Sequence, residues 1–320
     1  MSARTLDVDS WFDANTSAWG DHTLEELLEA KVTAGLSVSL VVPARNEAAT
    51  VGDVVGRVRS ALMETTALLD EIVVIDSDST DDTFAVAAGA GAVVHRSSEI
   101  RPDLGSVPGK GEAMWKSLFV TRGDLLVFMD ADLLDWDTHF VPGLVGPLLT
   151  RREIALVKGF YERPLVNGDT ASDSSGSAFE GGRVTELVAR PLLNLLFPEL
   201  AGLVQPLAGE WAVRRSLFAS LAVPTGYAVE TTALIDTLRT LGVDAIAQVD
   251  LGRRAHRHQA LRDLGAMATQ IVAAVVERAG VDRSDSSVSL RQYHPVDGQV
   301  APLTREVATS ERPPAVGFLG

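Results

Sequence analysis

The sequence predicts an α/β protein built on a doubly wound, mainly parallel sheet. Along residues 37–161, apolar runs of strand length alternate with segments whose apolar residues recur at three-to-four spacing. The runs are rich in Val, Ile and Leu with little alternation, as expected of strands buried on both faces. Several of them end in polar residues, and ligands of such sheets bind beyond the carboxyl ends of the strands. The pattern therefore predicts a ligand site at one edge of the sheet.

The first half of the chain supplies most of the expected strands. A short amphipathic segment at residues 22–32 precedes them. The expected strands are residues 37–44, 71–77, 92–96, 124–132 and 154–161. The expected helices between them are residues 50–65, 81–91 and 111–123, each with capping residues or C-terminal glycines.

The second half changes character. Residues 166–182 are small and polar, which predicts a flexible loop. Helical patterns follow at residues 183–197, 214–222, 229–242 and 261–280, with one strand-like run at residues 245–252. From residue 284 onward no periodicity is sustained, and this segment is interpreted as a tail or an arm that wraps a partner. We expect three parts, residues 1–165, 166–283 and 284–320.

Composition and charge narrow the classes of function. The chain of 320 residues has 46% hydrophobic and 22% charged residues, which is typical of a globular protein. Its net charge of −15, with no run of Lys and Arg, argues against a nucleic-acid partner. The absence of cysteine excludes disulfides, thiolate nucleophiles and thiolate zinc sites. With no apolar leader and no stretch of membrane-spanning length, we expect a cytoplasmic protein without a membrane partner.

The most informative run is GDLLVFMDADLL, residues 123–134, an apolar strand that ends in Asp130 and Asp132. The i, i+2 spacing lets a buried strand present hard oxygen ligands at the sheet edge, where a divalent cation can bridge the two phosphates of a nucleotide. A strand followed by an Asp-rich turn is the alternative interpretation, because short motifs recur by chance.

Three other segments fit the same ligand. The first strand leads into Pro43 and Glu47, which are placed to face a base and a ribose hydroxyl, although Glu in a first helical turn is also favoured by the macrodipole. The second strand ends at Ser77, close to residues that can cap the following helix. The glycine-rich GSVPGKGE supplies Lys110, a point charge suited to phosphate, but it lacks P-loop spacing, which disfavours nucleotide triphosphate hydrolysis.

Taken with later segments, these motifs form a recognisable set. The set comprises VVPARNEAAT, VVIDSDSTDDT, PGKGEAMWKSL, LLVFMDADL, EGGRVTELVARPLLN, PLAGEWAVRR, GYAVETTALID and RRAHRH, within residues 23–278. It resembles the GT-A glycosyltransferases and most closely the glucosyl-3-phosphoglycerate synthase family. Many glycosyltransferases share the early motifs, whereas GGRVTEL and PLAGE followed by RAHRH are specific to the family.

The resemblance implies a GT-A-type, Rossmann-like mixed sheet flanked by helices, with a mainly helical C-terminal part that binds the acceptor. It implies retaining transfer of glucose from UDP-glucose to 3-phosphoglycerate, with release of UDP. It further implies a homodimer and a divalent metal, Mg²⁺ first, with Mn²⁺ or Co²⁺ as alternatives. Residues 1–165 would then bind the donor, residues 166–283 would bind the acceptor and catalyse, and residues 284–320 would form the tail.

Carried over position by position, the resemblance also implies site residues. Donor binding falls to Pro43, Ala44, Arg45, Glu47, Ser77, Lys110, Asp130 and Ala131. Acceptor binding falls to Gly182, Arg183, Val184, Thr185, Arg254 and His258, and metal binding to Asp132 and His256. The catalytic group is Glu230, Asp130, Lys110 and Arg254. The chain departs from the family pattern at His258, where Asn is usual, and at Arg45, which replaces an apolar residue.

The chemistry of two segments agrees with these roles. Gly-Gly-Arg-Val-Thr at a helix start combines backbone amides, a hydroxyl and a guanidinium, which together suit a phosphate. A neutral imidazole at His256 can complete a metal site begun by Asp132, and Arg254 can neutralise an anionic acceptor.

Alternatives remain open from the residues alone. A mannosyl-3-phosphoglycerate synthase would use GDP-mannose on the same scaffold. A sugar-phosphate nucleotidyltransferase would use a similar sheet but release pyrophosphate, and a non-catalytic sugar-nucleotide sensor would bind without turnover.

Overall fold

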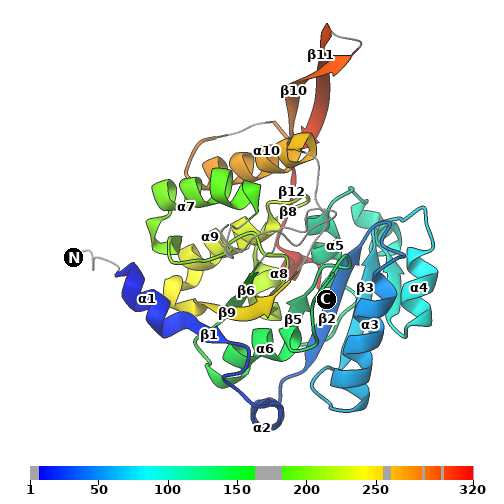
Figure 1. Cartoon of the computed structure of the whole chain (residues 1–320), viewed down its shortest axis with the longest axis vertical. Coiled ribbons are helices and arrows are strands. Elements are labelled where there is room, and N and C mark those ends of the chain that lie inside the picture. Colours follow the sequence, from blue (N-terminus) through cyan, green and yellow to red (C-terminus); the bar gives the residue numbers. More distant parts are fainter. Residues whose placement is uncertain (1–6, 163–181, 255–260, 283–284, 297–298, 320) are drawn as a thin grey trace, which may run out of the picture.

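The computed structural model describes residues 7–162, 182–254, 261–282, 285–296 and 299–319. A central eight-stranded sheet has the order β1-β9-β6-β7-β5-β2-β3-β4 and is flanked by helices on both faces (Figure 1). Its strands are β1 (Thr16–Ala18), β2 (Val38–Ala44), β3 (Glu71–Asp76), β4 (Val93–Arg96), β5 (Leu125–Phe128), β6 (Leu156–Glu162), β7 (Trp211–Arg214) and β9 (Ile246–Arg253). Every neighbouring pair is parallel except those that β7 makes with β5 and β6.

The remaining elements surround this sheet. The helices are α1 (Val8–Asn15), α2 (Leu24–Ala34), α3 (Val51–Arg59), α4 (Thr83–Gly89), α5 (Lys110–Ser117), α6 (Phe140–Thr150), α7 (Arg190–Leu196), α8 (Arg215–Ser220), α9 (Val229–Leu241) and α10 (Leu261–Arg278). Short 3₁₀ or π-helical turns lie at Ser60–Glu64, Ser97–Glu99, Pro102–Leu104, Thr185–Ala189, Pro198–Leu200, Val243–Ala245 and Ala315–Gly317. Two small antiparallel pairs complete the fold, β10 (Ser287–Val296) with β11 (Gln299–Ala308) and β12 (Glu311–Arg312) with β8 (Val223–Pro224).

Local sequence explains where elements start and stop. Thr23 and Glu26 form a capping box at the start of α2, and Gly35 ends that helix in the left-handed conformation with φ of 62°. β5 is buried at every position, and its residues alternate between the two faces of the sheet. Leu126 and Phe128 therefore join one hydrophobic cluster, whereas Leu125 and Val127 join the cluster on the other face.

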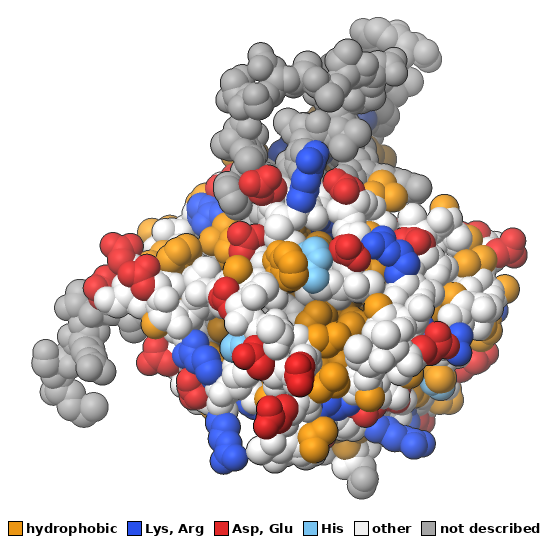
Figure 2. Space-filling model, turned by 60° about the horizontal axis from the view of Figure 1, so that its bottom comes forward, with side chains coloured by type: hydrophobic (Ala, Val, Ile, Leu, Met, Phe, Trp, Pro, Cys, Tyr) orange, Lys and Arg blue, Asp and Glu red, His pale blue; other side chains and the backbone are white. Residues whose placement is uncertain are grey.

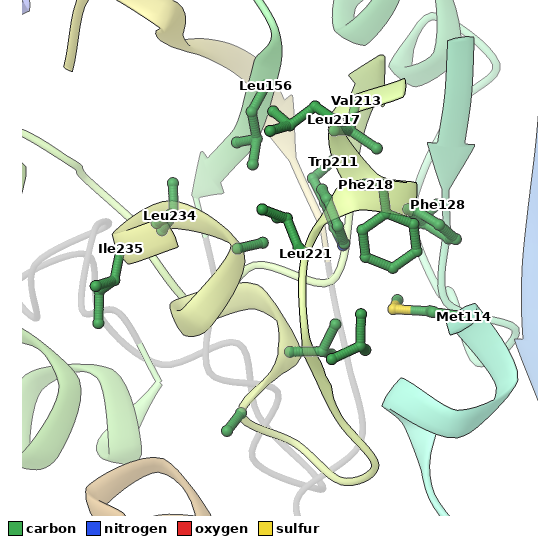
Figure 3. Packing of buried hydrophobic residues seen from close by; sticks show 14 of the residues in the cluster. Met114, Phe128, Leu156, Trp211, Val213, Leu217, Phe218, Leu221, Leu234 and Ile235 are labelled. Carbon is green, nitrogen blue, oxygen red and sulfur yellow. The ribbon is translucent and has the colours of Figure 1, made fainter. Parts of the chain in front are cut away.

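An aromatic group anchors the first of these clusters. Phe128 lies with its ring centroid 4.7 Å from that of Trp211 and 5.3 Å from that of Phe218. Figure 3 shows these rings together, with Met114 from α5 beside them and Leu221 from the segment after α8. Because Phe128 ends β5, Trp211 begins the adjacent strand β7 and Phe218 lies on α8, the cluster packs α8 against both strands.

The surface has dispersed charge. On the face seen in Figure 2, hydrophobic side chains gather near the centre, and acidic and basic side chains are scattered around them. This agrees with the sequence, in which Lys and Arg form no run. Among the residues that the structure describes, none of the helices combines the length and the apolar character needed to cross a bilayer.

Most expected elements are confirmed. The strands predicted at residues 37–44, 71–77, 92–96, 154–161 and 245–252 correspond to β2, β3, β4, β6 and β9. β5 ends at Phe128, so Asp130 and Asp132 lie beyond the strand. The loop predicted at residues 166–182 lies, apart from Gly182, outside the described residues. The boundaries at residues 165 and 283 stay predictions.

The C-terminal segment contains regular strands that the sequence did not predict. Residues 287–296 and 299–308 pair as β10 and β11 in a hairpin that projects from the body of the molecule, and β12 pairs with β8 (Figure 1). The alternation that begins in SVSL, residues 287–290, is interrupted by polar residues and by Pro295 and Pro302, so the sequence shows no sustained periodicity. A role as a tail or as an arm that wraps a partner stays a prediction.

Replacing Phe218 by Ala tests the aromatic cluster. Phe218 is fully buried, so removal of its ring is expected to lower the free energy of unfolding by about 3–5 kcal/mol. The matched control is Phe12→Ala on α1, where the side chain is 38% exposed and the loss should stay under about 1 kcal/mol. Urea unfolding of the two variants and the wild type measures both values. Equal losses would contradict the anchoring role.

Candidate active site

Polar residues that follow the strands of the sheet lie together at one of its edges. The carboxyl ends of β2, β3, β5, β6 and β9 meet there because these strands are parallel. β7 runs the other way, with Trp211 opposite Phe128, so the residue before it, Glu210, reaches the same edge. Side chains from strands far apart in the sequence therefore converge on one small region.

The segments predicted to hold a nucleoside lie side by side. Pro43 and Ala44 at the end of β2 pair in register with the end of β3, and the backbone N–H of Ser77 donates to the carbonyl of Ala44 at 2.8 Å. The backbone N–H of Glu47 donates to Thr83 Oγ1 at 2.8 Å, which fixes the loop after β2 to the start of α4. Arg45 lies between them and is exposed. The structure thus brings these predicted donor-binding residues together.

Lys110 is the centre of the charged cluster. Its Nζ atom lies 2.7 Å from Asp130 Oδ1 and 2.8 Å from Glu230 Oε1. Lys110 begins α5, Asp130 follows β5 and Glu230 lies in the first turn of α9, so three separate elements meet at one ammonium group. Burial alone would lower the pKa of Lys110, but the charges of Asp130 and Glu230 outweigh it and raise the pKa well above its ordinary value.

Arg254 faces the two aspartates after β5. Its Nη2 atom lies 3.3 Å from Asp130 Oδ2 and 3.5 Å from Asp132 Oδ1. Burial alone would raise the pKa of Asp130, but Lys110 and Arg254 together lower it below its usual range. Burial and the charge of Asp130 raise the pKa of Asp132, so the two carboxylates differ electrostatically. Ala131 between them is buried.

Asp132 offers one hard carboxylate ligand that a divalent cation at this edge could reach, because its side chain is 36% exposed. Its role as a metal ligand stays a prediction. Within the described ranges, no three His, Asp or Glu side chains are grouped closely enough to hold a metal alone. The second predicted ligand, His256, lies outside the described residues, as does His258.

The glycines on either side of Lys110 pack against the chain itself. A Cβ on Gly109 would collide with the carbonyl oxygen of Thr225, and one on Gly111 with that of Pro224. The N–H groups of Gly111 and Glu112 donate to the carbonyls of Gly226 and Thr225 at 3.2 and 2.9 Å. The start of α5 is therefore capped by the segment that leads into α9.

The predicted acceptor segment forms the start of a helix. The N–H of Glu186 donates to the carbonyl of Gly182 at 3.2 Å, so helical hydrogen bonding begins at Gly182. Arg183 is exposed, whereas Val184 and Thr185 are buried. The part that this segment plays in the site stays a prediction.

Sequence reasoning missed three residues that organise the cluster. Glu210 is fully buried and accepts hydrogen bonds from Tyr161 Oη at 2.8 Å and from Arg254 Nη1 at 2.7 Å. Lys158, 1% exposed in the middle of β6, donates to the carbonyl of Ala208 and lies 5.7 Å from the Trp211 ring centroid. Lys158 could have been found from the sequence, because it is a charged residue inside an otherwise apolar strand. Glu210 lay within a quoted motif, and Tyr161 ended an expected strand.

Comparisons with known proteins agree on one family. The sequence profile of Glycosyl transferase family 2 matches residues 39–193. The chain is 46% identical over 315 residues to the glucosyl-3-phosphoglycerate synthase of Mycolicibacterium smegmatis, covering 98% of both chains.

Two solved structures are also similar. The glucosyl-3-phosphoglycerate synthase of Mycobacterium tuberculosis, in complex with Mn²⁺, UDP-glucose and phosphoglyceric acid, has a TM-score of 0.82 and 44% identity, covering 95% of this chain and 99% of the other. The mannosyl-3-phosphoglycerate synthase of Rubrobacter xylanophilus has a TM-score of 0.87 and 40% identity, covering 98% of each chain.

Lys158 gives the site a testable pH signature. Burial lowers the pKa of Lys158 to about 7 in the folded protein, from an ordinary value of 10.5. Between these values the unfolded chain binds the extra proton, so this residue makes the folded state more stable as the pH rises. We expect the free energy of unfolding of the wild type, minus that of Lys158→Met, to increase from pH 7 to pH 9 by about 1 kcal/mol per pH unit. Urea unfolding across that range measures the difference, and a flat or falling difference contradicts the assignment.

Proposed function

The chain belongs to the glucosyl-3-phosphoglycerate synthases of glycosyl transferase family 2, and from this membership we propose how its residues transfer glucose from UDP-glucose to 3-phosphoglycerate. The observation that carries the proposal is the cluster of Lys110, Asp130, Glu230 and Arg254 at the carboxyl edge of the sheet. Oppositely charged groups held there by separate elements can bind a diphosphate, a sugar and an anionic acceptor at the same place.

The donor nucleotide is bound by the loops after β2 and β3. Pro43, Ala44 and Arg45 contact uridine from one side and Ser77 from the other, and Glu47 binds a ribose hydroxyl. The support is geometric, because β2 and β3 end in register and Ser77 is hydrogen-bonded to Ala44. Arg45 is the exposed member of the group, and it can approach the base without loss of a core contact.

Lys110 stabilises the leaving UDP. Its ammonium group is held between Asp130 and Glu230, and it stays charged because those carboxylates raise its pKa. Asp132 and His256 would hold a divalent cation, which neutralises the diphosphate charge when bound. The structure of the Mycobacterium tuberculosis relative contains Mn²⁺. Mg²⁺, Mn²⁺ and Co²⁺ stay the candidate ions for this chain.

The sugar lies between the carboxylates. Asp130 and the backbone of Ala131 contact glucose hydroxyls, and Glu230 lies beside the anomeric carbon, where its charge stabilises positive character as the bond to UDP breaks. The acceptor hydroxyl then bonds to that carbon from the face that UDP leaves, which retains the configuration, and its proton passes to the departing diphosphate oxygen. Arg254 lies beside both aspartates and neutralises the acceptor carboxylate as it approaches.

The acceptor phosphate is bound at the start of the helix at residues 182–189. Gly182, Val184 and Thr185 present backbone amides and a hydroxyl, and Arg183 presents a guanidinium that can bind two phosphate oxygens. His258 would complete this subsite. Arg183 is the exposed residue of the helix start, as a ligand-binding side chain requires.

GDP-mannose is the second candidate donor. The observation in its favour is the similarity to the mannosyl-3-phosphoglycerate synthase structure, at a TM-score of 0.87. Because the chain belongs to a hexosyltransferase family, the nucleotidyltransferase and sensor alternatives are no longer favoured. A homodimer and a cytoplasmic location come from the resemblance and the sequence, and both stay predictions.

A donor-by-acceptor matrix tests the proposed reaction. The protein is incubated with UDP-glucose or GDP-mannose, with 3-phosphoglycerate or its 2-phospho isomer, and with Mg²⁺, Mn²⁺ or a chelator. We expect release of UDP with UDP-glucose, 3-phosphoglycerate and metal together, and loss of turnover with chelator. Faster release of GDP from GDP-mannose would make the protein a mannosyltransferase, and release of pyrophosphate would contradict both assignments.

Arg183→Ala tests the acceptor subsite. Loss of a charge-assisted contact to phosphate is expected to raise KM for 3-phosphoglycerate by about tenfold to one hundredfold, with KM for UDP-glucose little changed. The control is Arg152→Ala, an exposed arginine before β6 at the opposite edge of the sheet, which should leave both KM values unchanged. Equal increases in the two KM values for Arg183→Ala would count against the phosphate role.

A further inference from the structure

The C-terminal strand β12 lies against the helix starts that carry the site. Glu311 pairs with Pro224 and Arg312 with Val223, and the N–H of Thr225 donates to the carbonyl of Ser310 at 3.0 Å. The residues after β8 lead directly into the first turn of α9, where Glu230 lies. β12 is therefore separated from the charged cluster by one short segment.

Arg312 holds the helix that carries Lys110. Its guanidinium binds Glu112 at two points, with Nε to Oε2 at 2.7 Å and Nη2 to Oε1 at 2.6 Å. It also donates to the carbonyl of Leu104 at 2.7 Å and stacks on Trp115 at 5.1 Å. Glu112 is fully buried and lies two residues after Lys110 on α5. Such a buried carboxylate requires its cationic partner.

Glu311 holds the helix that carries Glu230. Its Oε1 atom lies 2.7 Å from Arg278 Nη1 on α10, and Arg278 Nε donates to both carboxylate oxygens of Asp236 at 2.9 Å. Asp236 lies on α9, the helix that carries Glu230 in its first turn. The adjacent residues Glu311 and Arg312 thus connect, through partly buried ion pairs, to α9 and α5 respectively.

Figure 1 shows the arrangement of these elements, with β12 and β8 between α10, α9 and α5. The starts of α5 and α9 meet at the ion pair between Lys110 and Glu230, 2.8 Å long. We propose that the dipeptide Glu311-Arg312 acts as a clamp that sets the position of Lys110 relative to Glu230 and Asp130. Both are positioning residues. Arg312 acts on the cluster through Glu112, and Glu311 acts through Arg278 and through the pairing of β12 with β8.

The clamp predicts that loss of Arg312 acts through Lys110. The inference rests on the proposed function for its substrates, so the first measurement is calorimetric affinity for UDP in the presence of Mn²⁺, which needs no turnover. Arg312→Ala is expected to weaken UDP binding by about tenfold. In a Lys110→Ala background, Arg312→Ala should weaken UDP binding by less than about a further twofold. The value of kcat/KM for UDP-glucose should fall in parallel, with KM for 3-phosphoglycerate little changed.

Two further variants keep the test decisive. Arg312→Lys retains the charge but not the two-point contact, and it replaces Arg312→Ala if that variant does not fold. It is expected to fold and to show a loss of UDP affinity between those of the wild type and Arg312→Ala. Arg305→Ala is the matched control, because it removes a C-terminal ion pair, to Asp263 at 2.8 Å, that lies outside the clamp. It should bind UDP as the wild type does.

The clamp is overturned if folded Arg312→Ala and Arg312→Lys bind UDP as tightly as Arg305→Ala. The clamp is also overturned if the Arg312 substitutions weaken UDP binding as much in the Lys110→Ala background as in the wild type, because that result would show a general structural role. A wild type that binds UDP but transfers no glucose would contradict the proposed function and leave the binding test of the clamp intact.

Discussion

The need to neutralise buried carboxylates governs the architecture of the site. Asp130, Glu210 and Glu230 lie where water cannot solvate them fully, so each must face a cation held at a fixed place. Lys110 serves two of them, and Arg254 joins Glu210 to the aspartates. An unpaired charge would be costly at this depth, so the elements that carry the cluster cannot shift independently. The rigidity that a transfer reaction requires thus follows from electrostatics as much as from hydrophobic packing.

The reversed strand β7 makes this arrangement possible. A parallel strand at its position would bring its carboxyl end to the site and leave its beginning at the far edge. Because β7 runs against its neighbours, Glu210 and the turn before it reach the edge where Asp130 lies. A Cβ on Gly209 would collide with the Asp130 carboxylate, so the turn packs directly against it. The buried Lys158 holds the Ala208 carbonyl of the same turn. A mixed sheet therefore contributes to the chemistry as well as to the fold.

Sequence reasoning recovered what local pattern encodes. Apolar runs located β2, β3, β4, β6 and β9, and the motifs identified Lys110, Asp130, Glu230 and Arg254, which the structure brings together. It did not find the partners that these residues require. Glu210 meets Arg254 across 44 positions and Glu112 meets Arg312 across 200, and such pairings leave no periodic trace. The hairpin β10–β11 was missed for another reason, because the polar–apolar alternation that begins at residues 287–290 is not sustained along the two strands.

The position of Arg312 late in the chain has a consequence for how the protein is made. Ribosomes add about 5–20 residues per second, so the 200 positions between Glu112 and Arg312 take about 10–40 seconds to synthesise. During that interval the Glu112 carboxylate lacks the guanidinium that it binds in the folded protein. The nascent chain can form much of its sheet while its active site is still incomplete. If Arg312 positions α5 as proposed, the active site reaches its final geometry only after the C-terminal strand has been synthesised.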